Sequence, residues 1–358
     1  MRLFSICTFL LFFSKSAFST KCVSLEDVKM TVYSSGGVSY ETSITGCIER
    51  VAFPNPVVEV YVKHQNIPRL GRDSVRNMKH LHTVTFDNCG VKVVAPGAFR
   101  NVPNLKSVRI VSGVLEEVPN GVFSALPKLG ILKFHRNKIK TIERGAFAGI
   151  STLKQVFCDH NELREWDPRW FTNSTNLEIV DFQRNKIRSL PRRAFYDLPN
   201  VKEIYFEYNE LETVQPEAFT TLQKLKYLGL RYNRLKSLDS KVFPTDMFID
   251  TLTIDANYFN FLSRKVLAAL VVKRLTVDGN PWKCPCLDRV LLWLHEMNAT
   301  AVRSDNCVGG SVPVCSFAST FSTSCTEMVD NDVTRRYLDE LRKVDPPLDK
   351  YCARLEED

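Results

Sequence analysis

Beyond its first 19 residues, the chain contains no stretch that approaches about 20 consecutive apolar residues, the length that a membrane-spanning helix requires. It also ends in Leu-Glu-Glu-Asp358, whereas a cleaved-tail lipid anchor requires a hydrophobic C-terminal segment. These absences predict a chain with no membrane span and no lipid anchor.

Motifs of catalysis are also missing. The sequence contains no His-Glu-x-x-His, no Gly-x-Ser-x-Gly and no glycine-rich phosphate loop, and its six histidines form no regularly spaced column. Cys284-Pro-Cys286 has one intervening residue, whereas zinc sites typically use about two to four. We therefore expect a protein that is not an enzyme, takes no cofactor and binds no metal.

Residues 1–19 have the pattern of a secretory signal peptide. They carry an apolar run from Leu3 to Phe13 and small residues at Ala17 and Ser19, so cleavage is expected near Ser19. Removing the signal peptide with its two basic residues lowers the formal charge from +8 to +6. The signal peptide predicts a secreted, extracellular chain. Basic and acidic residues interleave in the remainder, which indicates a chain that does not bind nucleic acid.

A repeated unit is the dominant feature of the sequence. In its cleanest copy, Val201, Ile204, Phe206 and Leu211 are apolar and Asn209 precedes the last of them. This pattern, L-x-x-L-x-L-x-x-N-x-L, resembles the leucine-rich repeat. Alternation around Ile204 predicts a short strand, and the Asn209 amide can satisfy backbone groups at the following bend.

Two columns of residues repeat at a spacing of 24, with one final step of 23. The first, which we expect to form a hydrogen-bonded ladder, is Gln65, Cys89, Gly113, Asn137, Asn161, Asn185, Asn209, Asn233, Asn257 and Asn280. The second, an expected apolar spine, is Phe99, Phe123, Phe147, Phe171, Phe195, Phe219 and Phe243. One unit cannot bury its own apolar face but stacked units can, so the columns predict a solenoid.

The predicted fold is therefore an α/β solenoid: a leucine-rich repeat horseshoe of about ten repeats with a concave parallel sheet, capped by disulfides at both ends. Strands are expected at 60–62, 84–86, 108–110, 132–134, 156–158, 180–182, 204–206, 228–230, 252–254 and 275–277. The returning segments are too short for long helices, which favours single turns or 3₁₀ pieces. The predicted domains are a signal peptide (1–19), an N-terminal cap (20–56), repeats (57–282), a C-terminal cysteine-rich cap (283–325) and a charged, partly helical tail (326–358).

The N-terminal cap is predicted to be a hairpin with its turn near 35–37, closed by a Cys22–Cys47 disulfide. Cys89 and Cys158 are expected to be buried free thiols. They lie three repeats apart, about 14 Å at the strand spacing of a sheet, which is too far for a disulfide.

At the other end, Asn280-Pro-Trp-Lys-Cys-Pro-Cys286 and a predicted helix over 287–297 resemble the C-terminal cap of extracellular leucine-rich repeat proteins. In that family the first cysteine pairs with the third and the second with the fourth. The resemblance implies the pairs Cys284–Cys307 and Cys286 with Cys325 or Cys315. Six cysteines follow the repeats where the family has four, which leaves one bond open.

The tail from 326 to 358 has ten acidic and six basic residues and a weak amphipathic pattern from Val333 to Val344. The pattern predicts either a helix docked on the cap or a helix that binds a partner. Cys352 is expected to pair with Cys315 or to form a disulfide with a partner chain.

Outward-facing positions of the predicted strands suggest a binding surface. Aromatic residues there are not needed for the core, and charged residues surround them, as at the centre of an interface. The predicted ligand-binding residues are Lys133, Phe157, Ile179, Asp181, Tyr205, Tyr208, Tyr227, Arg231 and Tyr232. Asn173 and Asn298 begin the sequons Asn-Ser-Thr and Asn-Ala-Thr, which predicts glycosylation at both.

These features predict a recognition protein that binds a protein or a microbial-surface ligand through the concave face. A non-catalytic subunit of a larger complex, joined through the tail, and a cell-adhesion protein are the alternatives. A narrower resemblance to insect leucine-rich immune proteins, which have secreted repeats and covalent pairing through a helical C-terminal region, implies a role in innate immunity. The chain departs from those proteins because it lacks their long coiled coil.

Overall fold

The computed structural model describes residues 25–303, 314–317 and 323–343. The predicted signal peptide lies outside these residues, as do Cys22, Cys307 and Cys352.

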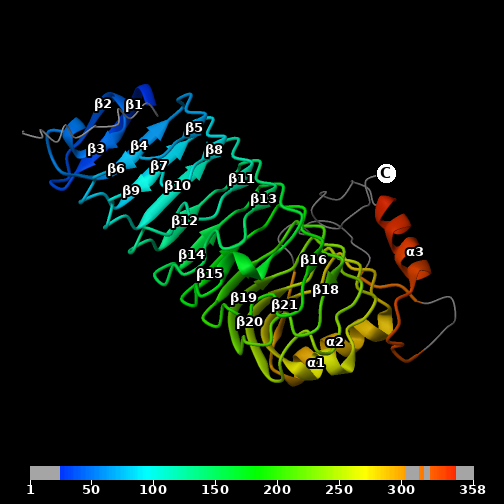
Figure 1. Cartoon of the computed structure of the whole chain (residues 1–358). Coiled ribbons are helices and arrows are strands. Elements are labelled where there is room, and N and C mark those ends of the chain that lie inside the picture. Colours follow the sequence, from blue (N-terminus) through cyan, green and yellow to red (C-terminus); the bar gives the residue numbers. More distant parts are fainter. Residues whose placement is uncertain (1–24, 304–313, 318–322, 344–358) are drawn as a thin grey trace, which may run out of the picture.

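The repeats and both caps contribute to a 13-stranded sheet whose strands lie side by side along an elongated molecule (Figure 1). In sheet order the strands are β2 (Ser39–Gly46), β1 (Leu25–Ser34), β4 (Val57–Lys63), β7 (Thr83–Asp87), β10 (Ser107–Val111), β12 (Ile131–Lys133), β14 (Gln155–Phe157), β15 (Ile179–Asp181), β17 (Glu203–Tyr205), β19 (Lys224–Gly229), β20 (Met247–Thr253), β21 (Leu270–Thr276) and β22 (Thr300–Val302). From β4 to β22 every neighbouring pair is parallel. The molecule is the predicted leucine-rich repeat horseshoe, with this sheet on its concave face.

The inward side chains explain why each repeat forms a strand at the same place. Val156 pairs with Leu132 on one side and Val180 on the other, and Ile204 continues the row to Leu228. All five side chains are buried, so each repeat completes the apolar core of the next. The predicted strands are confirmed, although all ten begin one or more residues earlier than expected.

The asparagine ladder is confirmed in the part from Asn137 to Asn280. Asn209 is representative: its Nδ2 donates to the Phe182 and Phe206 carbonyls at 2.9 and 3.1 Å, and its Oδ1 accepts from the Ile187 N–H at 3.0 Å. Each amide therefore satisfies backbone groups of two repeats at a bend where no strand partner exists. At the earlier position Cys89, the thiol lies 3.3 Å from the Val62 carbonyl and takes the place of the amide.

The phenylalanine spine lies on the other side of the core. Phe195, Phe219 and Phe243 stack with ring centroids 5.2 and 5.3 Å apart. Trp166 enters this layer and its ring lies 5.1 Å from that of Phe195. Buried aromatic stacking therefore ties successive repeats together opposite the sheet.

The returning segments are short and contain single turns, as predicted, such as 144–149 and 216–221. Many of them also pair with a neighbouring repeat, which was not predicted. They form two-residue parallel strands: β3 (Ile48–Glu49), β6 (Val75–Arg76) and β9 (Phe99–Arg100) in one sheet, and the pairs β5 (Arg69–Leu70) with β8 (Val93–Val94), β11 (Glu117–Val118) with β13 (Thr141–Ile142), and β16 (Ser189–Leu190) with β18 (Thr213–Val214). Within the described repeats, η2 (Pro168–Phe171) is the one 3₁₀ helix, and α1 (Arg264–Ala269) is the one α-helix. A second 3₁₀ turn, η1 (Arg50–Ala52), belongs to the N-terminal cap.

The N-terminal cap is the expected hairpin. β1 and β2 are antiparallel, and β1 also pairs antiparallel with β4, so that it covers the edge of the first repeat. Cys47 is disulfide-bonded, and its predicted partner Cys22 lies outside the described residues. The hairpin therefore covers the edge of the first repeat strand, and β2 becomes the outer strand of the sheet at this end.

At the C-terminal end, α2 (Cys284–Glu296) covers the last repeat and Trp282 is buried beneath it. The disulfides are Cys284–Cys315 and Cys286–Cys325. The second was one of the predicted alternatives, whereas the predicted Cys284–Cys307 pair is wrong, and so is Cys315–Cys352. The reason is a backbone contact: the Ser316 N–H donates to the Trp282 carbonyl at 2.8 Å and places Cys315 beside Cys284.

The tail contains helix α3 (Asn331–Arg342), close to the range predicted for it. Its apolar side chains Tyr337, Leu338 and Leu341 pack against Tyr258 of the repeats. Asn260 adds polar contacts, because its Nδ2 donates to the Thr334 hydroxyl at 3.1 Å and its Oδ1 accepts from the Asp330 N–H at 2.7 Å. The helix is therefore docked, and its apolar face is buried on its own chain.

Candidate ligand-binding face

The centre of the concave sheet carries a continuous row of outward side chains. Parallel pairing places Lys133, Phe157, Asp181 and Tyr205 at the same level on β12, β14, β15 and β17. The next residue in the row is Gly229 on β19. Because the register is identical in every repeat, side chains that are 24 residues apart in sequence become lateral neighbours.

Aromatic and basic side chains of this region contact one another in pairs. Tyr205 stacks on Tyr227 with ring centroids 4.7 Å apart. Lys133 Nζ lies 4.8 Å from the centre of the Phe157 ring, a cation–π distance. These contacts fix the rings before any ligand arrives.

A second row lies one step beyond the carboxyl ends of the strands. Tyr208 and Tyr232 have ring centroids 4.9 Å apart, and the Arg184 guanidinium lies 4.1 Å from the centre of the Tyr208 ring. Arg231 approaches the same ring at 5.7 Å. The Tyr208 ring therefore contacts two guanidinium groups and a second tyrosine ring.

The backbone at this second row is left-handed in repeat after repeat. Arg184, Tyr208 and Tyr232 have φ values of 52°, 55° and 55°, and none of them is glycine. Such a conformation costs an ordinary residue about 1 kcal/mol. The asparagine ladder directly after it stabilises the turn, so side chains can be presented here that would be disfavoured in an isolated turn.

Carboxylates beneath the rings hold the tyrosine hydroxyls. The Tyr205 hydroxyl donates to Glu203 Oε2 at 2.6 Å, and the Tyr227 hydroxyl donates to Glu207 Oε1 at 2.6 Å. Burial and these hydrogen bonds raise the pKa of Tyr205 and of Tyr227, so both remain neutral donors. The aromatic pair is therefore anchored at its polar ends as well as by stacking.

Glu207 is a buried carboxyl, only 4% exposed. It occupies the space over Gly229, since a Cβ at that glycine would clash with the Glu207 carboxylate. Burial is the main cause that raises the pKa of Glu207 to about 7. Burial, followed by the charge of Asp159, likewise raises the pKa of Asp181 to about 7.

A family comparison identifies the repeats. Residues 46–178 and 116–249 match the family described as BspA type leucine rich repeat region, with six copies of its unit, and together they span more than half of the chain. The chain belongs to this family. A comparison with the curated proteins finds no match.

Solved structures show the same fold as this leucine-rich repeat chain. A chain of the Drosophila Toll–Spatzle complex matches with a TM-score of 0.62 and 17% identity over 74% of this chain and 35% of that one. The glycosylated form of that complex gives 0.61 and 16%, over 74% of this chain and 36% of the other. The mouse RP105/MD-1 complex gives 0.56 and 16%, over 75% and 46%. The chain thus spans less than half of the length of these neighbours.

The predicted ligand-binding residues of this leucine-rich repeat chain are brought together, but they are less accessible than the sequence suggested. Lys133, Phe157, Ile179, Tyr205, Tyr208, Tyr227, Arg231 and Tyr232 are half-buried, and Asp181 is buried at 8% exposure. Lateral contacts between neighbouring repeats cover part of each ring. Glu207 precedes Tyr208 in the sequence and is buried rather than exposed beside these aromatic residues.

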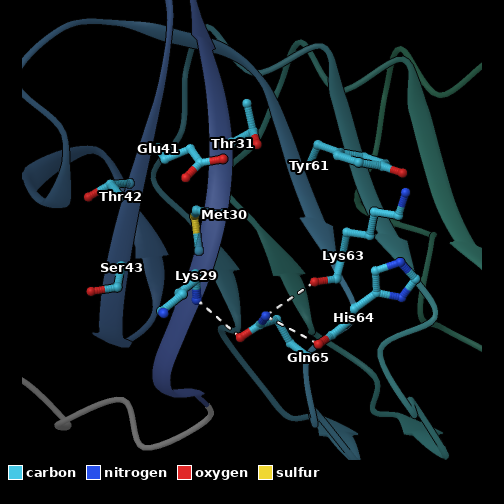
Figure 2. A pocket seen from close by; sticks show the side chains of 10 residues that line it. All are labelled: Lys29, Met30, Thr31, Glu41, Thr42, Ser43, Tyr61, Lys63, His64 and Gln65. Atoms are coloured by element: carbon cyan, nitrogen blue, oxygen red, sulfur yellow. Dashed lines mark hydrogen bonds between the residues drawn. The ribbon is translucent and has the colours of Figure 1, made fainter.

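A hollow of about 510 Å³ lies at the N-terminal end of the sheet and was not predicted. Side chains from β1, β2 and β4 line it, and Gln65 bridges two of these segments (Figure 2). Gln65 Nε2 donates to the Lys63 carbonyl at 3.2 Å, and its Oε1 accepts from the Lys29 N–H at 3.4 Å. The hollow exists only because the hairpin folds onto β4, which the repeat pattern does not encode.

Other kinds of site are not found in the described residues. They contain no group of three or more His, Cys, Asp or Glu side chains that could hold a metal ion. No helix among them has the length and apolar character of a membrane span.

Proposed function

We propose that the chain is a non-catalytic recognition protein that binds a protein ligand through the concave face between β12 and β20. The observation that carries the proposal is the anchored aromatic pair Tyr205–Tyr227, stacked at 4.7 Å and hydrogen-bonded to Glu203 and Glu207. Rigid, partly exposed tyrosines with fixed hydroxyls supply contact area at low entropic cost.

The structural neighbours support this role. Both are complexes, Toll–Spatzle and RP105/MD-1, and the former is a molecular hub in Drosophila development and innate immunity. A role of this chain in innate immunity is the corresponding proposal. The docked position of α3 counts against its apolar face being the site of assembly into a larger complex.

We further propose that the chain is extracellular. Its described disulfides, Cys284–Cys315 and Cys286–Cys325, are of the kind that persists in oxidising compartments. Asn173 and Asn298 are both exposed, as glycan acceptors must be. Peptide mapping of protein from the culture medium should find glycans at both sequons, and two unmodified sites would contradict this assignment.

Ligand capture with matched variants tests the binding face. Wild-type chain and the Tyr205→Ala/Tyr227→Ala variant are used as bait in extracellular fluid, and captured proteins are quantified by mass spectrometry. Tyr196→Ala is the control, because Tyr196 is an exposed tyrosine that follows the spine residue Phe195 and lies away from the sheet. We expect a partner retained by wild type and control and reduced at least tenfold by the double variant. Equal capture by all three would refute the proposal.

A further inference from the structure

A carboxylate lies between two aromatic residues at the centre of the concave face. Asp181 pairs laterally with Phe157 on β14 and with Tyr205 on β17. Neighbouring strands are about 4.8 Å apart, so the two aromatic residues are separated by about 10 Å, with a shorter side chain between them. Asp181 therefore lies in one row between two aromatic residues, and we call this position, bounded by Phe157 and Tyr205, the slot.

The existing contacts of the two rings lie on their outer sides. Lys133, which covers Phe157 at 4.8 Å, comes from β12, and Tyr227, which stacks on Tyr205, comes from β19. Both strands are on the far side of their ring from β15. Neither contact occupies the side that faces Asp181.

The slot carries negative charge without a basic partner from the chain. The Asp181 carboxylate accepts hydrogen bonds from the backbone N–H and the side-chain amide of Gln183, both at 3.2 Å. Within the part of the chain that the structure describes, Asp181 forms no ion pair, whereas the buried Asp255 is paired with Arg231 at 3.2 Å.

A second buried carboxyl adds to this charge. Glu207, on the other side of Tyr205, has one oxygen, Oε2, that is buried without a hydrogen-bond partner. The charge of Asp159 raises the pKa of Asp181, and the charge of Asp181 in turn raises the pKa of Glu207. Buried carboxylates are normally compensated by a cation or by donors, so this arrangement is complementary to a positive group that comes from outside.

We propose that this slot binds an arginine side chain of the protein ligand. A guanidinium is planar, stacks on aromatic faces and donates two parallel hydrogen bonds to a carboxylate. Because their strands are about 10 Å apart, the two rings can flank one such group. The inference rests on the proposed function, because it names the chemistry that the concave face recognises.

The acidity of the slot fits this chemistry. Burial raises the pKa of Asp181 to about 7, so the Asp181 carboxyl is partly protonated near neutral pH when the slot is empty. The charged groups that face it are Asp159, which follows β14, and Glu207, which follows β17. A bound guanidinium favours the ionised carboxylate and displaces the proton, so binding should strengthen as the pH rises from 6 to 8.

The slot can be tested without knowing the partner. Nα-acetyl-arginine amide is titrated against the full chain by NMR, and Nα-acetyl-citrulline amide, which has nearly the same shape without the charge, is the matched probe. We expect saturable millimolar binding of the arginine probe, at least tenfold weaker binding of the citrulline probe, and a tenfold loss in Asp181→Asn. Phe157→Ala should also weaken binding, whereas Glu59→Gln, a concave carboxylate on β4, should not.

Absence of saturable binding would overturn the proposal, as would equal affinity for the two probes or unchanged affinity in a folded Asp181→Asn chain. Phe157→Ala provides the second variant if Asp181→Asn does not fold. The outcome is separable from that of ligand capture. If Tyr205→Ala/Tyr227→Ala loses the partner but the wild-type chain does not bind the arginine probe, only the proposed arginine slot is refuted. If the wild-type chain binds the arginine probe but Tyr205→Ala/Tyr227→Ala captures the same proteins as wild type, only the proposed function is refuted.

Discussion

Neighbouring residues of one strand segment differ in role, because one side chain packs in the core and the next lies on the concave surface. Phe206 is fully buried, with its ring centroid 5.2 Å from that of Trp166, while Tyr205 points to the other side of the sheet. Phe206→Ala should therefore reduce the free energy of unfolding by about 3–5 kcal/mol. Tyr205→Ala should cost about 1 kcal/mol. Urea denaturation measures both, and similar losses would show that the in/out assignment is incorrect.

Asp181 should make stability depend on pH. Its pKa is raised from 3.8 to about 7 in the folded chain, so between these values the folded state binds more protons than the unfolded state. The contribution of this group to stability is therefore greatest at low pH and is lost as the pH rises through about 7. The stability of Asp181→Asn relative to wild type should therefore be at least about 1 kcal/mol higher at pH 8 than at pH 4.5. A difference that is the same at both pH values, measured by denaturation, would rule out the raised pKa.

Gly229 provides the space for the Glu207 carboxyl. A Cβ at residue 229 would lie within 2.5 Å of both Glu207 carboxylate oxygens, so Gly229→Ala should displace them and break the bond to the Tyr227 hydroxyl. We expect a loss of about 1–3 kcal/mol, as for other overpacked sites. Removing the carboxyl should relieve the clash, so Gly229→Ala/Glu207→Ala should be less destabilised than the sum of the two single variants. Additive losses in denaturation experiments would contradict the contact.

At the scale of elements, the strands could be predicted because inward side chains repeat at a fixed spacing. Val156, Val180 and Ile204 are apolar, adjacent and buried, and the residue between each pair of inward positions faces out. The N-terminal extension of β19 to Lys224 and of β20 to Met247 was not predicted. It depends on added backbone pairing, such as Lys224 with Phe248, and backbone pairing leaves no periodic signal in the side chains.

The parts that were missed depend on contacts between distant segments. The two-residue strands of the returning segments are defined by backbone hydrogen bonds alone. The burial of Asp181 depends on the strands that parallel pairing places on either side of it, whose residues Phe157 and Tyr205 are each 24 residues away. The cap disulfide Cys284–Cys315 depends on where the chain returns to Trp282, and the spacing of cysteines does not specify this.

For the whole molecule, the cysteines give the sharpest remaining test of assembly. Of the eleven, one falls in the predicted signal peptide, four form the described disulfides, Cys47 is bonded, and Cys89 and Cys158 are buried free thiols. If Cys22 is the partner of Cys47, then Cys307 and Cys352 remain. Two remaining thiols in an oxidising compartment are expected to pair with each other, whereas a partner chain would capture one of them.

We expect internal closure, because the number of cysteines left is even and the bonding of Cys315 to Cys284 leaves Cys352 with a single unassigned cysteine. Secreted protein should then run as a monomer on non-reducing gels, and peptide mapping should give a Cys307–Cys352 linkage. Cys352→Ser should free the Cys307 thiol for alkylation while the repeats remain folded. A heavier band that disappears both with reductant and in Cys352→Ser would instead show that the tail is covalently bound to a partner chain.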